Sequence, residues 1–217
     1  MKSSIRFPDP NEFSTPEGLI HVGGKMDSGT LLEAYSHGIF PWPHEDYPWL
    51  WFSPPERGIL NFEKLHISHS LKKFRKNHPD WRYTVNTCFS EVMTECQQQK
   101  RPGQPGTWIL NEMIPAYSEL SKLNRALSVE IWSYEKSLQP ELVGGIYGVL
   151  LPKYFSAESM FYKKPNASKL ALWFLVEELS QRGYSWMDLQ MVTPVTQSFG
   201  AELISRKNFL ERIRESS

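Results

Sequence analysis

Two polar residues, Asp188 and Gln190, stand two positions apart in an otherwise apolar segment of the chain. Side chains at this spacing project from the same face of a β-strand, so we expect a strand over residues 186–192 with both on one face. The opposite, buried face would carry Met187, Leu189 and Met191. The pair is consistent with a solvated sheet edge. It is also consistent with a site in which the acid orients the amide and the amide oxygen accepts a hydrogen bond from an attacking amine.

A carboxylate, Glu158, lies in a segment that is rich in large apolar residues and that we expect to form a strand over residues 154–161. Its neighbours are Phe155, Met160 and Phe161. A carboxylate in such surroundings either pairs with a cation or has a raised pKa. The alternative is an exposed Glu on an alternating strand. In a site that selects a cationic substrate, Glu158 would be the acid that attracts it.

One short segment with helical spacing, residues 68–77, carries the basic residues Lys72, Lys73, Arg75 and Lys76. Such a run is typical of a solvated helix face. The formal net charge of the whole chain is zero, which argues against indiscriminate nucleic-acid binding. In a neutral chain, this run is nevertheless the best candidate for contacts with the phosphates of an RNA partner.

Several classes of site lack their sequence signals. The residues His66 and His69 have no third ligand nearby, and two cysteines are too few for a disulfide framework or a cysteine-rich zinc site. The phosphate-binding loop of acetyl-CoA enzymes has no counterpart, so an acyl-CoA donor is disfavoured. We expect neither metal nor cofactor. The N-terminus has no apolar signal core, and the longest apolar run, residues 170–176, is far shorter than the ~20 residues of a membrane span. We therefore expect a cytoplasmic protein without membrane contacts. We also expect a monomer.

The first 54 residues are rich in Gly, Pro and aromatic side chains, and only residues 30–37 have helical spacing. After this helical segment, prolines at positions 41, 43, 48, 54 and 55 exclude regular structure, so we expect the proline-rich segment to be an ordered loop. The expected organisation is a small aromatic- and proline-rich N-terminal domain, residues 1–54, followed by a second domain, residues 55–217.

The second domain alternates between strand-like and helical segments. Helices are expected over residues 68–77, 89–98, 111–123, 168–181 and 208–214. Strands are expected over residues 83–85, 128–132, 142–150, 154–161 and 186–192. This order predicts an α/β (α+β) domain with a mixed sheet covered by helices, and it is similar to the core of the acetyltransferase (GNAT-like) superfamily.

Three short motifs together resemble one enzyme family. They are Gly38-Ile-Phe-Pro-Trp42, Ala157-Glu-Ser-Met-Phe161 and Asp188-Leu-Gln190. From about residue 18 to its C-terminus, the chain resembles the leucyl/phenylalanyl-tRNA–protein transferases. The chain departs from the family pattern at Lys25, Pro152, Ala157, Tyr162 and Phe199, while the residues that the family uses in its site are present.

The resemblance implies a GNAT-like fold and transfer of Leu, Phe or Met from aminoacyl-tRNA to the N-terminal Arg or Lys of acceptor proteins. This transfer marks the acceptors for N-end-rule degradation. Asp188 and Gln190 would be catalytic, and Glu158 would help to place the basic acceptor. The aminoacyl-adenosine end of the donor would be held by Trp42, Trp108 and Phe155. Ile146 and Phe155, on strands near Glu158, would complete a pocket for a Leu or Phe side chain. The basic run at residues 72–76 would contact the tRNA.

Two alternatives remain open from the sequence. One is another GNAT-like acyltransferase that uses CoA or a peptidoglycan precursor, and binding of acetyl-CoA would distinguish it. The other is a non-catalytic module that recognises basic N-terminal residues, which would bind Arg-starting peptides yet leave aminoacyl-tRNA intact.

Overall fold

The computed structural model describes residues 5–44, 46–100, 107–134, 139–152 and 154–215. The strands are β1 Leu19–Val22, β2 Phe40–Pro41, β3 Leu50–Phe52, β4 Glu56–Asn61, β5 Trp81–Val85, β6 Ala126–Ser133, β7 Glu141–Leu150, β8 Phe155–Tyr162, β9 Trp186–Gln190 and β10 Glu202–Ser205. The helices are α1 Ser28–Ser36, the 3₁₀ turn η1 Phe62–Lys64, α2 His69–Asn77, α3 Phe89–Gln98, α4 Met113–Lys122, α5 Ala167–Gln181, α6 Pro194–Ser198 and α7 Arg206–Glu215.

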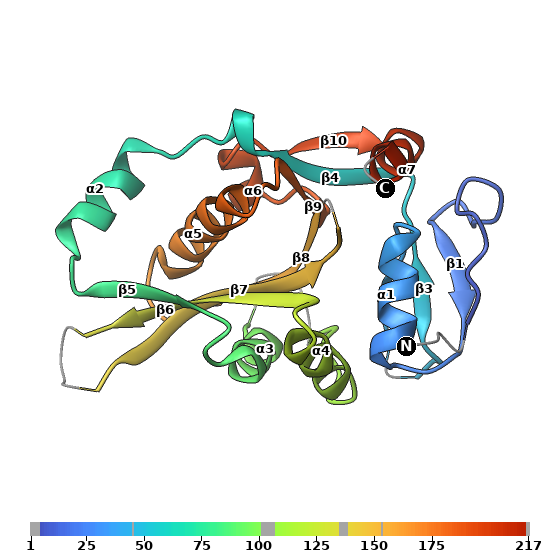
Figure 1. Ribbon diagram of the computed structural model, residues 1–217, viewed down its shortest axis with the longest axis horizontal. Coiled ribbons are helices and arrows are strands. Elements are labelled where there is room, and N and C mark those ends of the chain that lie inside the picture. The colour runs from blue at the N-terminus through green and yellow to red at the C-terminus, as the bar shows by residue number, and fades with distance from the viewer. Residues whose placement is uncertain (1–4, 45, 101–106, 135–138, 153, 216–217) are drawn as a thin grey trace.

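A seven-stranded sheet in the order β10-β4-β9-β8-β7-β6-β5 organises the larger part of the chain. Strands β8 and β9 pair in parallel, and the other neighbours pair antiparallel. The sheet curls around α5, while α3 and α4 cover its other face (Figure 1). The predicted mixed sheet covered by helices is confirmed.

Two apolar clusters fill the two faces of this sheet. The cluster beneath α5 includes Leu170 and Leu175 of that helix, together with Met187 of β9. The cluster beneath α3 and α4 includes Tyr117, and it also contains residues from the first 52 positions, such as Tyr35. Burial of apolar surface on both faces holds the strands in register, so the polar residues between them have fixed positions.

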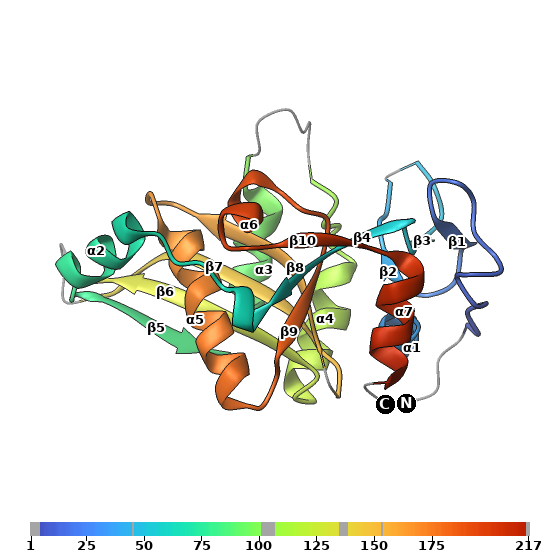
Figure 2. The same cartoon turned by 90° about the horizontal axis from the view of Figure 1, so that it is seen from above.

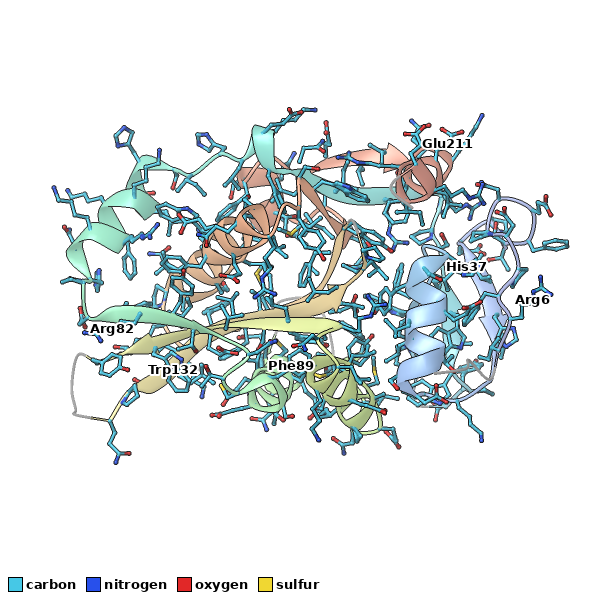
Figure 3. All side chains as sticks on the ribbon, viewed as in Figure 1. Arg6, His37, Arg82, Phe89, Trp132 and Glu211 are labelled. Carbon is cyan, nitrogen blue, oxygen red and sulfur yellow. The ribbon has the colours of Figure 1, made fainter. Side chains whose placement is uncertain are left out.

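Residues 5–52, here called the N-terminal unit, form α1 and a three-stranded sheet in the order β1-β3-β2. This unit lies at one end of the large sheet, beside α7 (Figure 2). Side chains fill the space between α1, which ends just before the labelled His37, and the large sheet (Figure 3). The three-stranded sheet ends at Phe52 and the large sheet begins at Glu56; a domain boundary at residues 54–55 stays a prediction.

The helices and strands predicted within residues 55–217 are present, and each end lies within two residues of its expected position. The expectation of a loop without regular structure around the prolines is wrong, because β2 and β3 pair there. Pro41 is tolerated since β2 is an edge strand, where a missing N–H breaks no ladder. Strands β4 and β10 and helix α6 also lie outside the predicted elements.

Local sequence explains how α1 begins and ends. The side chain of Asp27 accepts a hydrogen bond from the backbone N–H of Thr30 at 2.8 Å, which caps the first turn. Gly38 follows the last turn with φ +71, as expected of a C-terminal glycine. Asn166 occupies the N-cap position of α5, and its side chain forms no cap hydrogen bond there.

Within the described ranges, no helix combines the length and the apolar character that a bilayer span requires. The same residues contain no group of three or more His, Cys, Asp or Glu side chains that could hold a metal ion. The sequence predicts no apolar signal core at the N-terminus. Residues 1–4 of that segment lie outside the described residues.

Candidate active site

Arg57 and Asp188 form a buried ion pair at the centre of the site. Arg57 lies on β4, and Asp188 lies on the neighbouring strand β9. Nε of Arg57 is 2.8 Å from Oδ1 of Asp188, and Nη2 is 2.7 Å from Oδ2. This is the bidentate geometry in which a guanidinium and a carboxylate bind most strongly. The side chains are 1% and 0% exposed, so the carboxylate on the covered sheet has its cation inside the protein.

Asp188 is connected to Gln190 in two ways. Its Oδ1 accepts a hydrogen bond from the backbone N–H of Gln190 at 2.9 Å. Its Oδ2 accepts one from the Ser156 hydroxyl at 3.0 Å, and this hydroxyl accepts one from the side-chain amide of Gln190 at 2.9 Å. The same amide nitrogen donates to Oε1 of Glu158 at 3.1 Å. Asp188 therefore reaches the Gln190 side chain through Ser156.

The backbone of Gln190 adopts a left-handed conformation with φ 57, which residues other than glycine seldom adopt. Strand β9 ends at this bend, and its register against β4 shifts between Gly58 and Ile59. A Cβ added at Gly58 would lie 2.6 Å from the carbonyl carbon of Met191, so glycine is required opposite the bend. Met191 is 52% exposed, and the expectation that it shares the buried face of the strand is wrong.

Glu158 has a strongly raised pKa. Burial raises the pKa of its carboxyl from the ordinary value of 4.5 to about 8. The negative charge of Asp188 also raises this pKa. Hydrogen bonds from Tyr35 and Ser156 and the positive charge of Arg57 lower it, and they offset only part of the rise. The carboxyl therefore changes its protonation state close to neutral pH, where proton transfer is most effective.

Two tyrosine hydroxyls close the side of the site that faces the N-terminal unit. Oη of Tyr35 on α1 and Oη of Tyr117 on α4 lie 2.7 Å apart, and both side chains are buried. Burial, followed by the charge of the neighbouring Glu158, raises the pKa of each hydroxyl well above its ordinary value. Both hydroxyls therefore keep their protons and can donate. Helix α1 is thus part of the site as well as part of the N-terminal unit.

Trp42 and Trp108 lie together, although 66 positions separate them in the sequence. Their rings stack with a centroid separation of 5.6 Å and an interplanar angle of 11°. Both rings are partly buried and pack against the cluster that contains Tyr35 and Tyr117. The structure therefore places these two predicted donor-binding residues on the same side of the sheet as the tyrosine pair. Their role in binding the donor stays a prediction.

Ile146 and Phe155 lie elsewhere. They are 3% and 0% exposed and belong to the apolar cluster beneath α5, whereas Ser156, the next residue on β8, faces Asp188. Successive side chains of a strand point to opposite faces. The five residues predicted to hold substrate are therefore not gathered into one pocket, and any contact of Ile146 or Phe155 with the donor has to come from the α5 face.

The four basic residues of α2 have different surroundings. Lys72, Lys73 and Lys76 are exposed. Arg75 instead forms an ion pair with Glu177 of α5 at 3.0 Å, and its guanidinium lies 4.5 Å from the ring centre of Trp173. Arg75 fastens α2 to α5, so only the three lysines present freely accessible charges to an RNA.

Four residues of the network escape prediction from the sequence: Arg57, Ser156, Tyr35 and Tyr117. Ser156 carries a usable signal, because it lies two positions before Glu158 on a predicted strand and shares its face. A buried Asp also implies a nearby buried cation, but nothing singles out Arg57 among 24 Lys and Arg residues. The tyrosines occupy apolar helix positions that are indistinguishable from ordinary core positions.

This arrangement is suited to an amine nucleophile. Both hydrogens of the Gln190 side-chain amide are engaged, one by Ser156 and one by Glu158. Within the described part of the chain, the side-chain oxygen of Gln190 has no donor, so it can accept a hydrogen bond from a substrate. An acid with a raised pKa lies beside it. An amine must lose its proton before it can attack a carbonyl carbon, and these groups can hold and deprotonate it.

Comparison with known sequences gives one consistent family. The model described as leucyl/phenylalanyl-tRNA protein transferase matches residues 59–214, and that of its N-terminal domain matches residues 24–55. A relative from Maridesulfovibrio salexigens, named leucyl/phenylalanyl-tRNA–protein transferase, is 46% identical over 211 residues, which cover 97% of this chain and 85% of the relative. One of the same name from Flavobacterium psychrophilum is 41% identical and covers 99% of each chain.

Among solved structures, FemX resembles this chain in fold. The TM-score is 0.50 at 9% identity, over 82% of this chain and 66% of FemX. This likeness confirms the predicted GNAT-like fold and is too distant in sequence to carry function. The sequence matches extend through the segments that hold Arg57, Ser156, Glu158, Asp188 and Gln190. The chain therefore belongs to the leucyl/phenylalanyl-tRNA protein transferase family of enzymes.

Proposed function

We propose that this enzyme transfers Leu, Phe or Met from aminoacyl-tRNA to the N-terminal Arg or Lys of acceptor proteins. The observation that carries the proposal is the linked set of hydrogen bonds from Asp188 through Ser156 and Gln190 to Glu158, in a chain that belongs to this family. The donor ester is already activated, so the transfer needs neither ATP nor a further cofactor.

The reaction replaces an ester bond by an amide bond. The acceptor's α-ammonium group first loses one proton, and the free amine then attacks the carbonyl carbon of the aminoacyl ester. The C–N bond forms as the bond between the acyl carbon and the ribose oxygen breaks, and the second proton of the nitrogen passes to that oxygen. The side-chain oxygen of Gln190 accepts a hydrogen bond from the amine and fixes its direction of attack.

Glu158 has two tasks in this scheme. Its carboxylate attracts the cationic acceptor, and it takes the first proton from the α-ammonium group. A free α-amino group has a pKa of about 7.7–8.0, which matches the pKa of about 8 for Glu158. Because the two values are close, the proton can move in either direction at little cost. Asp188 acts on Gln190 through its backbone N–H and through Ser156.

The donor end of the site is assigned to Trp42 and Trp108. Their rings offer stacking surfaces, and stacking on an aromatic ring contributes ~1–3 kcal/mol per base. The rings stack on each other in this structure, so an adenine base binds either on an outer face or after the two separate. Lys72, Lys73 and Lys76 are assigned to phosphate contacts with the tRNA.

Three broader expectations belong to the same proposal. Addition of an apolar residue at the N-terminus would mark the acceptor for N-end-rule degradation. The family name supports aminoacyl-tRNA and protein as the two substrates. A cytoplasmic location and a monomeric state are expected from the sequence, and both stay predictions.

The test is transfer of radiolabelled Leu from Leu-tRNA to a protein that begins with Arg, beside the same protein beginning with Ala. Labelling of the Arg protein alone is the expected result. Equal labelling of both would contradict the acceptor assignment. No labelling with Leu-, Phe- or Met-tRNA would contradict the proposed reaction.

A further inference from the structure

Arg57 is the point at which three separate parts of the chain meet. It belongs to β4 of the large sheet, and its fork binds Asp188 on β9. Its remaining Nη1 donates to the backbone carbonyl of Gly38, in the N-terminal unit, at 2.9 Å. The guanidinium also lies over two rings, 4.7 Å from the centre of Phe40 and 4.4 Å from that of Phe209 on α7.

Gly38 allows these parts of the chain to pack closely around Arg57. Gly38 follows α1 in a left-handed conformation, and a Cβ there would come within 2.6 Å of Leu210 and 2.8 Å of Phe209. A glycine at this position lets the end of α1 approach α7 closely, so that its carbonyl reaches Arg57. Arg57 is therefore held on one side by the N-terminal unit, on another by α7, and on the third by Asp188.

A buried guanidinium needs partners on every nitrogen, because an unpaired buried charge is strongly destabilising. Arg57 is 1% exposed, and its Nε, Nη1 and Nη2 each donate to an acceptor within 2.9 Å. A displacement of Gly38 would leave Nη1 without its acceptor, and a displacement of Phe209 would remove one of the two rings against the guanidinium. The guanidinium plane would then turn, and the carboxylate of Asp188, which it holds at two points, would turn with it.

We propose that Arg57 is a positioning residue for the transfer reaction, and that it couples the packing of the N-terminal unit and α7 to the orientation of Asp188. Asp188 in turn holds the backbone N–H of Gln190 and the hydroxyl of Ser156. The geometry of the reacting centre thus depends on contacts that no substrate makes. This inference rests on the proposed function.

The first variant is Arg57→Lys, which keeps the charge but cannot hold both oxygens of Asp188 and the Gly38 carbonyl at once. Turnover at saturating donor should fall by about 10- to 100-fold, since small misplacements at a reacting centre have effects of that order. The KM for the aminoacyl donor should stay within about twofold, because Arg57 does not belong to the assigned donor surface.

The second variant, Phe209→Leu, tests the coupling itself, because the ring of Phe209 lies 4.4 Å from the guanidinium of Arg57 and also packs against Tyr154 and Trp186. Its matched control is Phe174→Leu, which replaces a buried ring on α5 that stacks on Tyr83 in the other apolar cluster, outside the N-terminal unit and α7. Both variants should lower the melting temperature. Only Phe209→Leu should lower turnover per folded molecule, with KM unchanged.

A pH profile separates positioning from general destabilisation. The charge of Arg57 is one of the groups that lower the pKa of Glu158, so Arg57→Met should move the rise of turnover to higher pH. Arg57→Lys should leave that rise in place. Equal turnover in Phe209→Leu and Phe174→Leu, or wild-type turnover in Arg57→Lys, would overturn the inference. A wild-type enzyme without transferase activity would instead overturn the proposed function on which it rests.

Discussion

The side-chain nitrogen of Gln190 lies 3.1 Å from Oε1 of Glu158, although 32 positions separate these residues in the sequence. The contact joins the end of β9 to the neighbouring parallel strand β8. It fixes which end of the Gln190 amide faces Glu158, and it leaves the amide oxygen for a substrate. Glu158 can therefore serve as proton acceptor next to the group that orients the amine.

The link between Ser156 and Gln190 predicts a non-additive pair of substitutions. Gln190→Ala should lower turnover by about 10²-fold, the lower range for loss of a group that assists proton transfer. Ser156→Ala should lower it by about tenfold, roughly the effect of one hydrogen bond. Because both act on the same amide, the double variant should be no slower than Gln190→Ala alone.

Single-turnover transfer from Leu-tRNA measures these three variants. Ser90→Ala on α3, which removes an exposed hydrogen bond to Ser118, is the control and should retain wild-type turnover. Effects that multiply in the double variant would contradict a shared role, and a tenfold loss in the control would point to a general effect of the substitution.

The raised pKa of Glu158 predicts a pH-dependent rate. If its carboxylate takes the proton from the acceptor, turnover should rise with pH and level off above about pH 8. Glu158→Gln cannot accept the proton, so its turnover should be low and should not show this rise. The measurement is single-turnover transfer between pH 6 and 9.5 to an Arg-starting protein. The same rise in the variant would assign it to the acceptor's amine alone.

The same shift predicts how folding stability depends on pH. The folded state binds the proton of Glu158 more tightly than the unfolded state does, since the pKa is about 8 when folded and 4.5 ordinarily. The contribution of Glu158 is therefore fully present below pH 4.5 and is lost as the pH rises through 8. Glu158→Gln should lack this loss. Urea unfolding of both proteins at pH 6 and pH 9 measures it, and parallel behaviour would contradict the assignment.

Elements were easier to predict from the sequence than the contacts between them. Strand β9 and its Asp188 and Gln190 follow from the alternation of polar and apolar residues, because alternation reports directly which face is buried. Strand β10 carries no such signal: it is a four-residue edge strand in which Leu203 is 53% exposed. Strands β2 and β3 were not predicted, because the prolines in this segment indicated a loop although its apolar residues are compatible with strands.

Residues of the site differ in whether the sequence could identify them. Glu158 and Gln190 could be named individually, since each is a polar residue in an apolar segment. Arg57 and Tyr35 could not, because their role depends on which strand pairs with β4 and on how α1 approaches the sheet. Spacing along one strand or helix cannot report a contact between residues 131 positions apart, such as that of Arg57 with Asp188.

The different surroundings of the α2 residues predict two kinds of effect. Substitution of Lys72 and Lys73 by Glu should weaken tRNA binding and reduce the slope of log K against log[salt] by about 0.7–0.9 per lost phosphate contact. Turnover at saturating tRNA should change little. Arg75→Ala should instead lower the melting temperature, because it removes the contact with Glu177 and Trp173. Filter binding at several salt concentrations measures the first effect, and an unchanged slope would contradict it.

The stacked Trp42 and Trp108 predict that donor binding depends on two rings and must displace at least part of their mutual contact. A base held between them needs about 7 Å between the ring planes, two contacts of about 3.5 Å, whereas the ring centres are 5.6 Å apart.

Trp108→Ala should therefore raise the KM for the donor by about tenfold or more, given ~1–3 kcal/mol per stacked base, and leave turnover at saturation nearly unchanged. Trp132→Ala removes a ring of similar size that is hydrogen-bonded to Thr84 at 2.8 Å on β5, and it serves as the control. Steady-state transfer with an aminoacyl-adenosine donor measures both parameters without the rest of the tRNA. A loss of turnover without a change in KM in Trp108→Ala would place that ring at the reacting centre instead of the donor surface.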